Sequence, residues 1–290
     1  MAEKVTEYPV VWLQTATCTG CSVSVLNSFS PGIKNLLIDE IIPGSHLNLK
    51  FHATVMAGQG DLVIEAMEEV QKEKLGRYLL VVEGAIPTAE DGVYGAIGEK
   101  NGVPLKMTDM VESLGSDALA VVALGTCASF GGIPAGSPNP TNAMGVREFF
   151  EEKGITTPLI NIPGCPPHPD WFVNTVVHVL IAGLPGASAL DEHLRPKTFY
   201  GRLIHENCPR RAYFDEGKFA KKLGDEECMF EMGCKGPVTS ADCPLRQWNS
   251  AVNWCIGNNS PCMGCVEPTF PDMLSPLYEK ITDLEIPKIG

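Results

Sequence analysis

Cysteines are concentrated in one stretch of this chain, and their number suggests iron–sulfur chemistry. Seven of the 11 cysteines lie between His205 and Cys265, namely Cys208, Cys228, Cys234, Cys243, Cys255, Cys262 and Cys265. The other four are Cys18, Cys21, Cys127 and Cys165. Cuboidal iron–sulfur clusters usually take four protein ligands each. Eleven thiols are one short of three such sets, and His205, separated from Cys208 by two residues in HENC, is placed to supply the missing ligand.

The spacing of the C-terminal group suggests two ligand sets. One set would be His205, Cys208, Cys228 and Cys234, and the other Cys243, Cys255, Cys262 and Cys265. A disulfide framework is the first alternative, but the cysteine count is odd and no signal peptide is visible. Structural zinc is the second, because CxxC pairs suit tetrahedral thiolate sites. Zinc modules keep their ligands close in sequence, whereas the cysteine that follows Cys21 is Cys127.

Strands and helices alternate in the first 187 residues. Short apolar segments predict buried strands at 9–14, 49–55, 78–83, 118–124 and 158–162. Helical periodicity predicts a helix after Cys21 and further helices at 61–74, 107–115, 145–153 and 170–182. This alternation predicts parallel βαβ units in a doubly wound, flavodoxin-like α/β sheet.

The first four cysteines follow the ends of predicted strands. Cys18 and Cys21 come after 9–14, Cys127 after 118–124 and Cys165 after 158–162. Ligand sites in open α/β sheets form outside the carboxyl ends of the strands, so these four thiols are expected to meet. Glycines that would let backbone approach a cluster lie around them: Gly20, Gly125, Gly131, Gly132 and Gly164. The alternative is four unrelated buried thiols.

The sequence changes character after residue 187. Regular periodicity fades, proline and glycine are frequent, and cysteines recur. A segment with so little apolar patterning is hard to fold alone, and bound metal can supply the missing free energy. We therefore predict two domains, an α/β domain at 1–187 with the first thiol set and a smaller, irregular cluster-binding domain at 188–290.

Composition excludes several classes of protein. A net charge of −13 and a pI near 4.9 argue against nucleic-acid binding. No apolar run approaches the roughly 20 residues that span a bilayer, so no transmembrane segment is predicted. The N-terminus (Met1 to Pro9) lacks an apolar signal region and a twin-arginine motif. This favours a cytoplasmic protein, with the periplasm as the alternative if a leader has been removed.

The remaining histidines are weaker candidates for chemistry. His46, His52, His178 and His193 have no metal-like neighbours and are interpreted as surface or packing residues. His168 follows Cys165 in PGCPPHPD, where it would either hydrogen-bond near the first thiol set or hold its loop.

Several motifs together resemble one family, the small, electron-transferring subunit of nickel–iron hydrogenases. The resemblance rests on CTGCSVSVLN (18–27), VEGAIP (82–87), GTCASFGGIP (125–134), IPGCPPHPDW (162–171), IHENC (204–208), MGCKGP (232–237) and CMGCVEP (262–268). The first motifs are partly shared with the cluster-bearing subunit of respiratory NADH–quinone oxidoreductases. The C-terminal histidine-and-cysteine segment is not, and it favours the hydrogenase family.

The resemblance implies a role for each ligand. A proximal [4Fe–4S] cluster falls on Cys18, Cys21, Cys127 and Cys165, and a distal [4Fe–4S] cluster on His205, Cys208, Cys228 and Cys234. The medial ligands fall on Cys243, Cys262 and Cys265. Common members have proline at the Cys255 position and a medial [3Fe–4S] cluster. This chain resembles the branch with a fourth cysteine, which includes nickel–iron–selenium enzymes, so a medial [4Fe–4S] cluster is expected unless Cys255 does not ligate.

The resemblance also bears on oxygen tolerance. Oxygen-tolerant members add two cysteines beside the proximal cluster, and Gly20 and Gly132 occupy those positions here. An ordinary proximal cluster is therefore expected.

The resemblance further implies an obligate partner, a large subunit that carries the Ni–Fe centre where H2 is split or made. This chain then holds no catalytic residue and relays electrons to an external redox partner. Five basic residues near the distal ligands are either a guide for an acidic partner or a solvated face: Arg210, Arg211, Lys218, Lys221 and Lys222. Glu83 is expected near the proximal cluster and the subunit boundary. The alternative is a stand-alone multi-cluster carrier or the cluster subunit of another redox complex.

Overall fold

The computed structural model describes residues 6–32, 34, 35, 39 and 44–280. The chain forms two compact units, Met1–Ser188 and Ala189–Gly290. The boundary expected from the sequence, after residue 187, lies one residue from this division.

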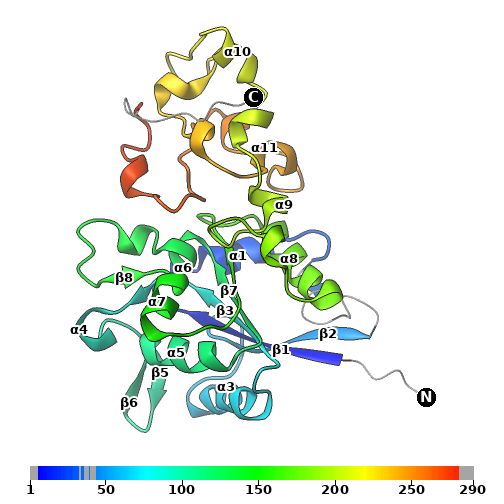
Figure 1. Ribbon diagram of the computed structural model, residues 1–290, viewed down its shortest axis with the longest axis vertical. Helices are drawn as coiled ribbons and strands as arrows, with labels where there is room; N and C mark the ends of the chain where they lie inside the picture. The colour runs from blue at the N-terminus through cyan, green and yellow to red at the C-terminus, as the bar shows by residue number, and fades with distance from the viewer. Residues whose placement is uncertain (1–5, 33, 36–38, 40–43, 281–290) are drawn as a thin grey trace. The chain divides into compact units, whose positions relative to one another are not determined.

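A five-stranded parallel sheet forms the centre of the first unit (Figure 1). Its strands are β1 Thr6–Gln14, β2 Ser45–His52, β3 Leu79–Glu83, β7 Ala120–Leu124 and β9 Leu159–Ile162. They lie in the order β2-β1-β3-β7-β9, and every neighbouring pair is parallel. Numbered along the chain, this is the 2-1-3-4-5 order of flavodoxin-like sheets, which reverses between the first and third strands. The predicted flavodoxin-like α/β fold is therefore confirmed.

Helices connect these strands close to the positions predicted from periodicity. The longer ones are α1 Gly20–Leu26, α3 Asp61–Glu73, α5 Met107–Asp117, α7 Val146–Lys153 and α8 Pro169–Ala182. Shorter ones are α4 Ala89–Gly92, α6 Thr126–Phe130, η1 Ile133–Ala135 and, at the unit boundary, η2 Ala187–Ala189. Nowhere in the described ranges is a helix both long and apolar enough to cross a bilayer.

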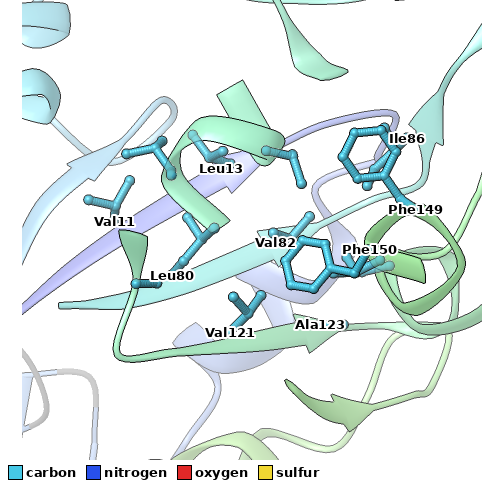
Figure 2. Close-up of a cluster of buried hydrophobic side chains, with 14 of the residues drawn as sticks. Val11, Leu13, Leu80, Val82, Ile86, Val121, Ala123, Phe149 and Phe150 are labelled. Atoms are coloured by element: carbon cyan, nitrogen blue, oxygen red, sulfur yellow. The ribbon is translucent and has the colours of Figure 1, made fainter. Parts of the chain in front are cut away.

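Strand residues alternate between two buried faces. Val11 and Leu13 of β1 point to the face that α3, α5 and α7 cover, where the core in Figure 2 also includes Leu80, Val82 and Phe150. The intervening β1 residues, Val10 and Trp12, face the other side of the sheet. There they form a second apolar layer with Val25 of α1 and with Phe172 and Val176 of α8. Both faces are buried because helices cover both sides, which explains why the strands are continuous apolar runs.

Two small antiparallel ribbons were not expected from the sequence. One pairs β4 Ile86–Pro87 with β8 Ala143–Met144, and the other pairs β5 Ala96–Lys100 with β6 Val103–Lys106. The second turns at Asn101 and Gly102, both with positive φ. Asn-Gly is the preferred dipeptide of tight hairpins, so this signal was present in the sequence.

The second unit consists of short helical turns joined by loops. They are α9 Lys197–Tyr200, η3 Ile204–Asn207, α10 Arg211–Asp215, η4 Met229–Met232, η5 Gly236–Val238, α11 Cys243–Arg246, η6 Ile256–Asn258 and η7 Asp272–Leu274. In the described part of this unit, β pairing is limited to isolated bridges.

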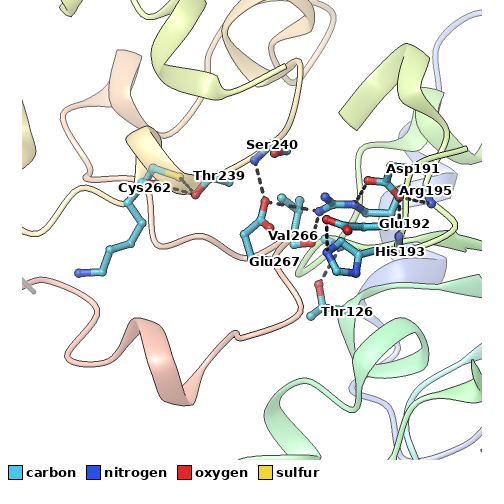
Figure 3. A network of polar contacts seen from close by, with 12 residues as sticks. Thr126, Asp191, Glu192, His193, Arg195, Thr239, Ser240, Cys262, Val266 and Glu267 are labelled. Atoms are coloured by element: carbon cyan, nitrogen blue, oxygen red, sulfur yellow. Dashed lines mark hydrogen bonds and ion pairs between the residues drawn. The ribbon is translucent and has the colours of Figure 1, made fainter. Parts of the chain in front are cut away.

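A buried ionic network links distant segments of this unit (Figure 3). Arg195 donates from Nε to Asp191 (2.7 Å) and from Nη1 to Glu267 (3.4 Å). Glu267 in turn accepts the backbone N–H of Ser240 at 2.6 Å. The network fixes the chain just after Cys265.

Candidate metal centres

The structure brings the first four cysteines together at one edge of the sheet. Cys18 and Cys21 lie where β1 passes into α1, Cys127 lies in α6 after β7, and Cys165 lies in the loop after β9. The Cys21 thiol interacts electrostatically with the other three thiols. All 11 cysteines lie in the described part of the chain, and none of them is assigned to a disulfide. The carboxyl ends of three strands thus present four thiols, as predicted.

Glycine backbone packs directly against three of these four sulfur atoms. A Cβ atom would lie 3.1 Å from the Cys18 Sγ at Gly20, 2.5 Å from the Cys21 Sγ at Gly125 and 3.1 Å from the Cys127 Sγ at Gly132. A side chain at Gly125 would overlap the Cys21 sulfur, and one at Gly20 or Gly132 would require the neighbouring cysteine to shift. The residues present therefore form a close backbone cradle that fits an inorganic cluster.

Burial makes the Cys21 and Cys127 thiols poor ligands unless a positively charged group is bound. It raises the pKa of Cys127 to about 11 and raises the pKa of Cys21 far above its ordinary value. Glu83 and the neighbouring thiols raise the Cys21 pKa further. Metal ligation requires thiolates, so the charge of bound iron must offset these effects.

Glu83 ties the end of β3 to the loop that carries Cys18 and Cys21. Its carboxylate is fully buried and accepts hydrogen bonds from Trp12 Nε1 (2.9 Å), Thr17 Oγ1 (3.2 Å) and the Ser22 backbone N–H (3.2 Å). The Ser22 hydroxyl also donates to this carboxylate and contacts His52 Nε2 at 3.1 Å. Glu83 was expected near the first thiol set, whereas Ser22 was not, although its position directly after Cys21 was the available signal.

Replacing Glu83 with glutamine should lower the free energy of unfolding by about 1–3 kcal/mol. The amide keeps one acceptor oxygen and introduces a donor group, so at least one of the buried Trp12 and Ser22 N–H groups loses its partner. Thermal unfolding of the anaerobically purified protein measures the effect. Glu99→Gln, at an exposed position of β5, is the matched control. Its free energy of unfolding should stay within about 0.5 kcal/mol of that of the unmodified protein. Equal stability of the two variants would contradict the role of Glu83.

The second ligand set lines one concavity in the second unit. About 290 Å³ of space, partly open to solvent, is bordered by all four predicted ligands, His205, Cys208, Cys228 and Cys234. The His205 side chain is buried, and its Nε2 atom has no hydrogen-bond partner among the described residues. A buried imidazole nitrogen without a partner is costly unless it binds something, so His205 fits a ligand role.

The environment of His205 favours its neutral form. Burial lowers its pKa, and the positive charge of Arg211 lowers it further. Phe214 packs edge-on against the imidazole, with ring centroids 4.4 Å apart, and also contacts Phe219 and Phe230. An aromatic wall thus holds a neutral histidine, which is the protonation state that metal ligation needs.

The third set gathers around Cys243 and Cys262. Burial raises the pKa of Cys243 well above its ordinary value, and Cys265 and Cys255 raise it further. The Cys262 thiol is buried and interacts electrostatically with Cys265 and Cys243, and also with Cys234 of the second set. The structure therefore brings Cys255 close to Cys243, which in turn interacts with Cys265 and Cys262.

In the described ranges, no three or more His, Cys, Asp or Glu side chains are placed to hold a metal ion. In a cubane each protein ligand binds a different iron, so its ligands surround the cluster instead of a single atom.

Other predicted residues have mainly structural contacts. The His168 side chain is buried and its Nδ1 accepts the backbone N–H of Asp170 at the start of α8, which is the loop role considered for it. His52 is buried against Trp12, in agreement with a packing role. Arg210 donates to the carbonyls of Asp225 and Glu227 and to the Asn259 side chain.

Two more of the five basic residues near the distal ligands form ion pairs with acidic side chains. Arg211 forms an ion pair with Asp215 (2.9 Å) and Lys218 with Glu216 (2.8 Å). Lys221 and Lys222 are exposed, and their backbone N–H groups donate to Asp225. The group is therefore less available for guiding a partner than the sequence suggested.

Family models match both parts of the chain. Residues 200–278 match the family described as the C-terminal part of the NiFe/NiFeSe hydrogenase small subunit. Residues 18–179 match the family described as NADH ubiquinone oxidoreductase, 20 Kd subunit. This is the pattern noted in the motifs, where the N-terminal part is shared between two families and the C-terminal part is specific to hydrogenases.

Curated relatives and solved structures agree with these matches. The periplasmic [NiFeSe] hydrogenase small subunit of Desulfomicrobium baculatum is 45% identical over 287 residues, covering 96% of this chain and 89% of that protein. The periplasmic [NiFe] hydrogenase small subunit of Solidesulfovibrio fructosivorans is 41% identical over 276 residues, covering 93% and 81%. The oxidised recombinant [NiFeSe] hydrogenase from Desulfovibrio vulgaris Hildenborough superimposes with a TM-score of 0.89 at 45% identity, covering 96% of this chain and all of that one.

These relatives correct one prediction. The first residues of the chain favour the cytoplasm, but these similar proteins are named periplasmic, so that prediction was wrong. A short, polar first segment is compatible with either compartment, so it could not decide between them. On motifs, sheet order and overall similarity, the chain belongs to the small-subunit family of nickel–iron and nickel–iron–selenium hydrogenases, oxidoreductases whose iron–sulfur clusters act with a Ni–Fe centre on a large subunit.

Proposed function

We propose that this chain passes electrons singly between the Ni–Fe centre of a large subunit and an external redox partner through three [4Fe–4S] clusters. The proposal rests on the grouping of the 11 cysteines and His205 into three sets of four. The first unit holds one complete set, and the second unit holds two. Such a division provides a series of redox sites within one small subunit.

The residues of each set would have distinct tasks. Cys18, Cys21, Cys127 and Cys165 would hold the proximal cluster, His205, Cys208, Cys228 and Cys234 the distal cluster, and Cys243, Cys255, Cys262 and Cys265 the medial cluster. When bound, the clusters would supply sites that accept and release one electron each. A neutral His205 gives the distal set one negative charge fewer than a set of four thiolates, and net charge is one of the quantities that set a cluster's potential.

The position of Cys255 supports a four-iron medial cluster. This thiol is close enough to Cys243 to raise its pKa. A [3Fe–4S] cluster needs three thiolates, whereas Cys243, Cys255, Cys262 and Cys265 provide four. The medial site is therefore proposed to resemble the other two in cluster type.

Metal and sulfide analysis, combined with EPR, tests the proposal directly. The complex purified anaerobically with its large subunit should contain about twelve cluster irons in this chain and show no [3Fe–4S] signal when oxidised. A Cys255→Ala variant should lose about one iron and gain that signal, while the unmodified protein is the control. A [3Fe–4S] signal in the unmodified protein would remove Cys255 from the ligand set, and zinc without sulfide would overturn the whole assignment.

The relatives and the distal site also suggest where the protein works and what it contacts. The similar proteins are named periplasmic, so we assign this chain to the periplasm. The external redox partner is proposed to dock beside the distal set. Exposed Lys221 and Lys222 offer a modest positive guide there, because Arg210, Arg211 and Lys218 are already engaged within the unit.

A further inference from the structure

Lys235 is a charged residue in an unusual place. It follows Cys234 directly, and only 1% of its surface is exposed, which makes it one of the largest fully buried side chains in the described part of the chain. Lysine is almost never fully buried unless it is paired, because removing its ammonium group from water is costly. A buried lysine beside a predicted ligand therefore needs an explanation.

The ammonium group is held by neutral carbonyl oxygens. Its Nζ donates to the backbone oxygens of Glu279 (2.8 Å) and Pro276 (3.3 Å). Among the described residues, no carboxylate forms an ion pair with it. The acidic groups that interact electrostatically with the ammonium are the thiols of Cys234 and Cys262 and, after them, the carboxylate of Glu279. Its positive charge therefore acts on these two sulfurs and on one carboxylate.

The same residue lies at a backbone junction between the two ligand sets. The Lys235 N–H donates to the Cys262 carbonyl oxygen at 2.7 Å, and the Cys262 N–H donates to the Cys234 Sγ at 3.4 Å. Cys234 belongs to the distal set and Cys262 to the medial set. Lys235 is therefore the chain neighbour of one distal ligand, Cys234, and its backbone is hydrogen-bonded to one medial ligand, Cys262.

We propose that Lys235 is a shared electrostatic positioning residue that raises the reduction potentials of both cluster sites in the second unit. The proposal rests on the ligand assignment given above. Each reduction adds one electron and one unit of negative charge to a site, and no bond to Lys235 forms or breaks. A buried positive charge stabilises that added negative charge, because the low dielectric of the interior screens it weakly.

A charge-removing variant tests this idea. Lys235→Met removes the positive charge and keeps an unbranched apolar stem, and Lys235→Gln removes it while keeping a polar end that can donate to a carbonyl. In an EPR-monitored redox titration of the whole complex, both variants should lower the medial and distal midpoint potentials. The expected change is roughly tenfold in the ratio of reduced to oxidised cluster at a fixed potential, or about 59 mV for one electron. The proximal midpoint should not move.

Lys280 provides the matched control. It is also in the second unit, but its side chain is 39% exposed and forms an ion pair with Glu231 at 2.6 Å. Lys280→Met removes the same formal charge from a solvated position, so both midpoints should stay unchanged.

Each other outcome has a distinct meaning. Unchanged midpoints in Lys235 variants with full iron content, or a shift at only one of the two sites, would overturn the shared role. Loss of iron from the second unit in both variants would show a purely structural role and also overturn it. Absence of the two cluster signals in the unmodified complex would instead refute the proposed ligand sets.

Discussion

Replacing Arg195 with methionine is expected to destabilise the second unit by about 3–5 kcal/mol, which at roughly 4 °C per kcal/mol for a unit of this size corresponds to a fall of about 12–20 °C in its unfolding temperature. The Arg195 side chain is 5% exposed and forms ion pairs with Asp191 and Glu267, whose side chains are 17% and 13% exposed. It also donates to the Val266 carbonyl and lies over the ring of Tyr200. Methionine fills much of the space but leaves two buried carboxylates without a cation, and this accounts for the large cost.

The pH dependence of this variant should identify the cause. Burial already raises the pKa of Glu267, and Arg195 opposes that rise. Without the arginine, this pKa should rise further, so the folded protein retains a proton that the unfolded chain releases. Because the folded variant then binds more protons than its unfolded chain, its stability falls as pH rises. The loss of stability relative to the unmodified protein should therefore be smaller at pH 5 than at pH 8.

Thermal unfolding of the anaerobic complex at both pH values measures this effect. Arg147→Met is the matched control, because Arg147 pairs with Glu151 on the exposed side of α7. Losing this exposed ion pair should change the free energy of unfolding by no more than about 0.5 kcal/mol. A loss of stability in the Arg195 variant that is independent of pH would point to lost packing instead of unpaired charge.

Replacing Gly125 with alanine is expected to abolish the proximal site. Its backbone, at φ 91° and ψ 158°, lies in a region that is essentially restricted to glycine, and the strain alone costs about 1–3 kcal/mol. The new Cβ would also lie 2.5 Å from the Cys21 Sγ, so this thiol must move away from its place in the set. Iron should fall by about four atoms per chain, and the proximal EPR signal should disappear while the other two remain.

Gly154→Ala separates backbone strain from contact with the ligand. Gly154 has φ 68° at the end of α7, and no atom lies within 4 Å of an added Cβ. This control should show a loss of about 1–2 kcal/mol with all of its iron retained. Full iron content and an unchanged proximal signal in Gly125→Ala would contradict the cradle inferred around the first thiol set.

The part of the site that could be predicted from the sequence depends on regular elements. The strands Leu79–Glu83 and Ala120–Leu124 are continuous apolar runs because both faces of the sheet are covered, and their carboxyl ends are easily located. Cys127 could therefore be placed at the same edge as Cys18 and Cys21 from the order of the apolar runs alone. The strand predicted at 49–55 lies instead at Ser45–His52, because a turn follows the pairing of Trp12 with His52.

Residues that depend on irregular tertiary contacts could not be predicted. Lys235 and Arg195 are charged, and charged side chains are normally expected at the surface. Their burial depends on carbonyls at Pro276 and Glu279 and on the carboxylate of Glu267, all remote in sequence. Short turns of three to five residues have no periodicity that would reveal such contacts. Arg210 was likewise assigned to a surface group, although loop carbonyls hold it.

The sheet order also sets the sequence of events during biosynthesis. β9 pairs only with β7 in the described sheet, and Cys165 follows β9, so the first thiol set is incomplete until almost the whole first unit has been synthesised and paired. Ribosomes release roughly 5–20 residues each second, so Cys18 and Cys21 must wait for their partners for many seconds. The ligands that emerge first thus belong to a site that is completed late, and a cluster held by all four cannot form there before Cys165 has been synthesised.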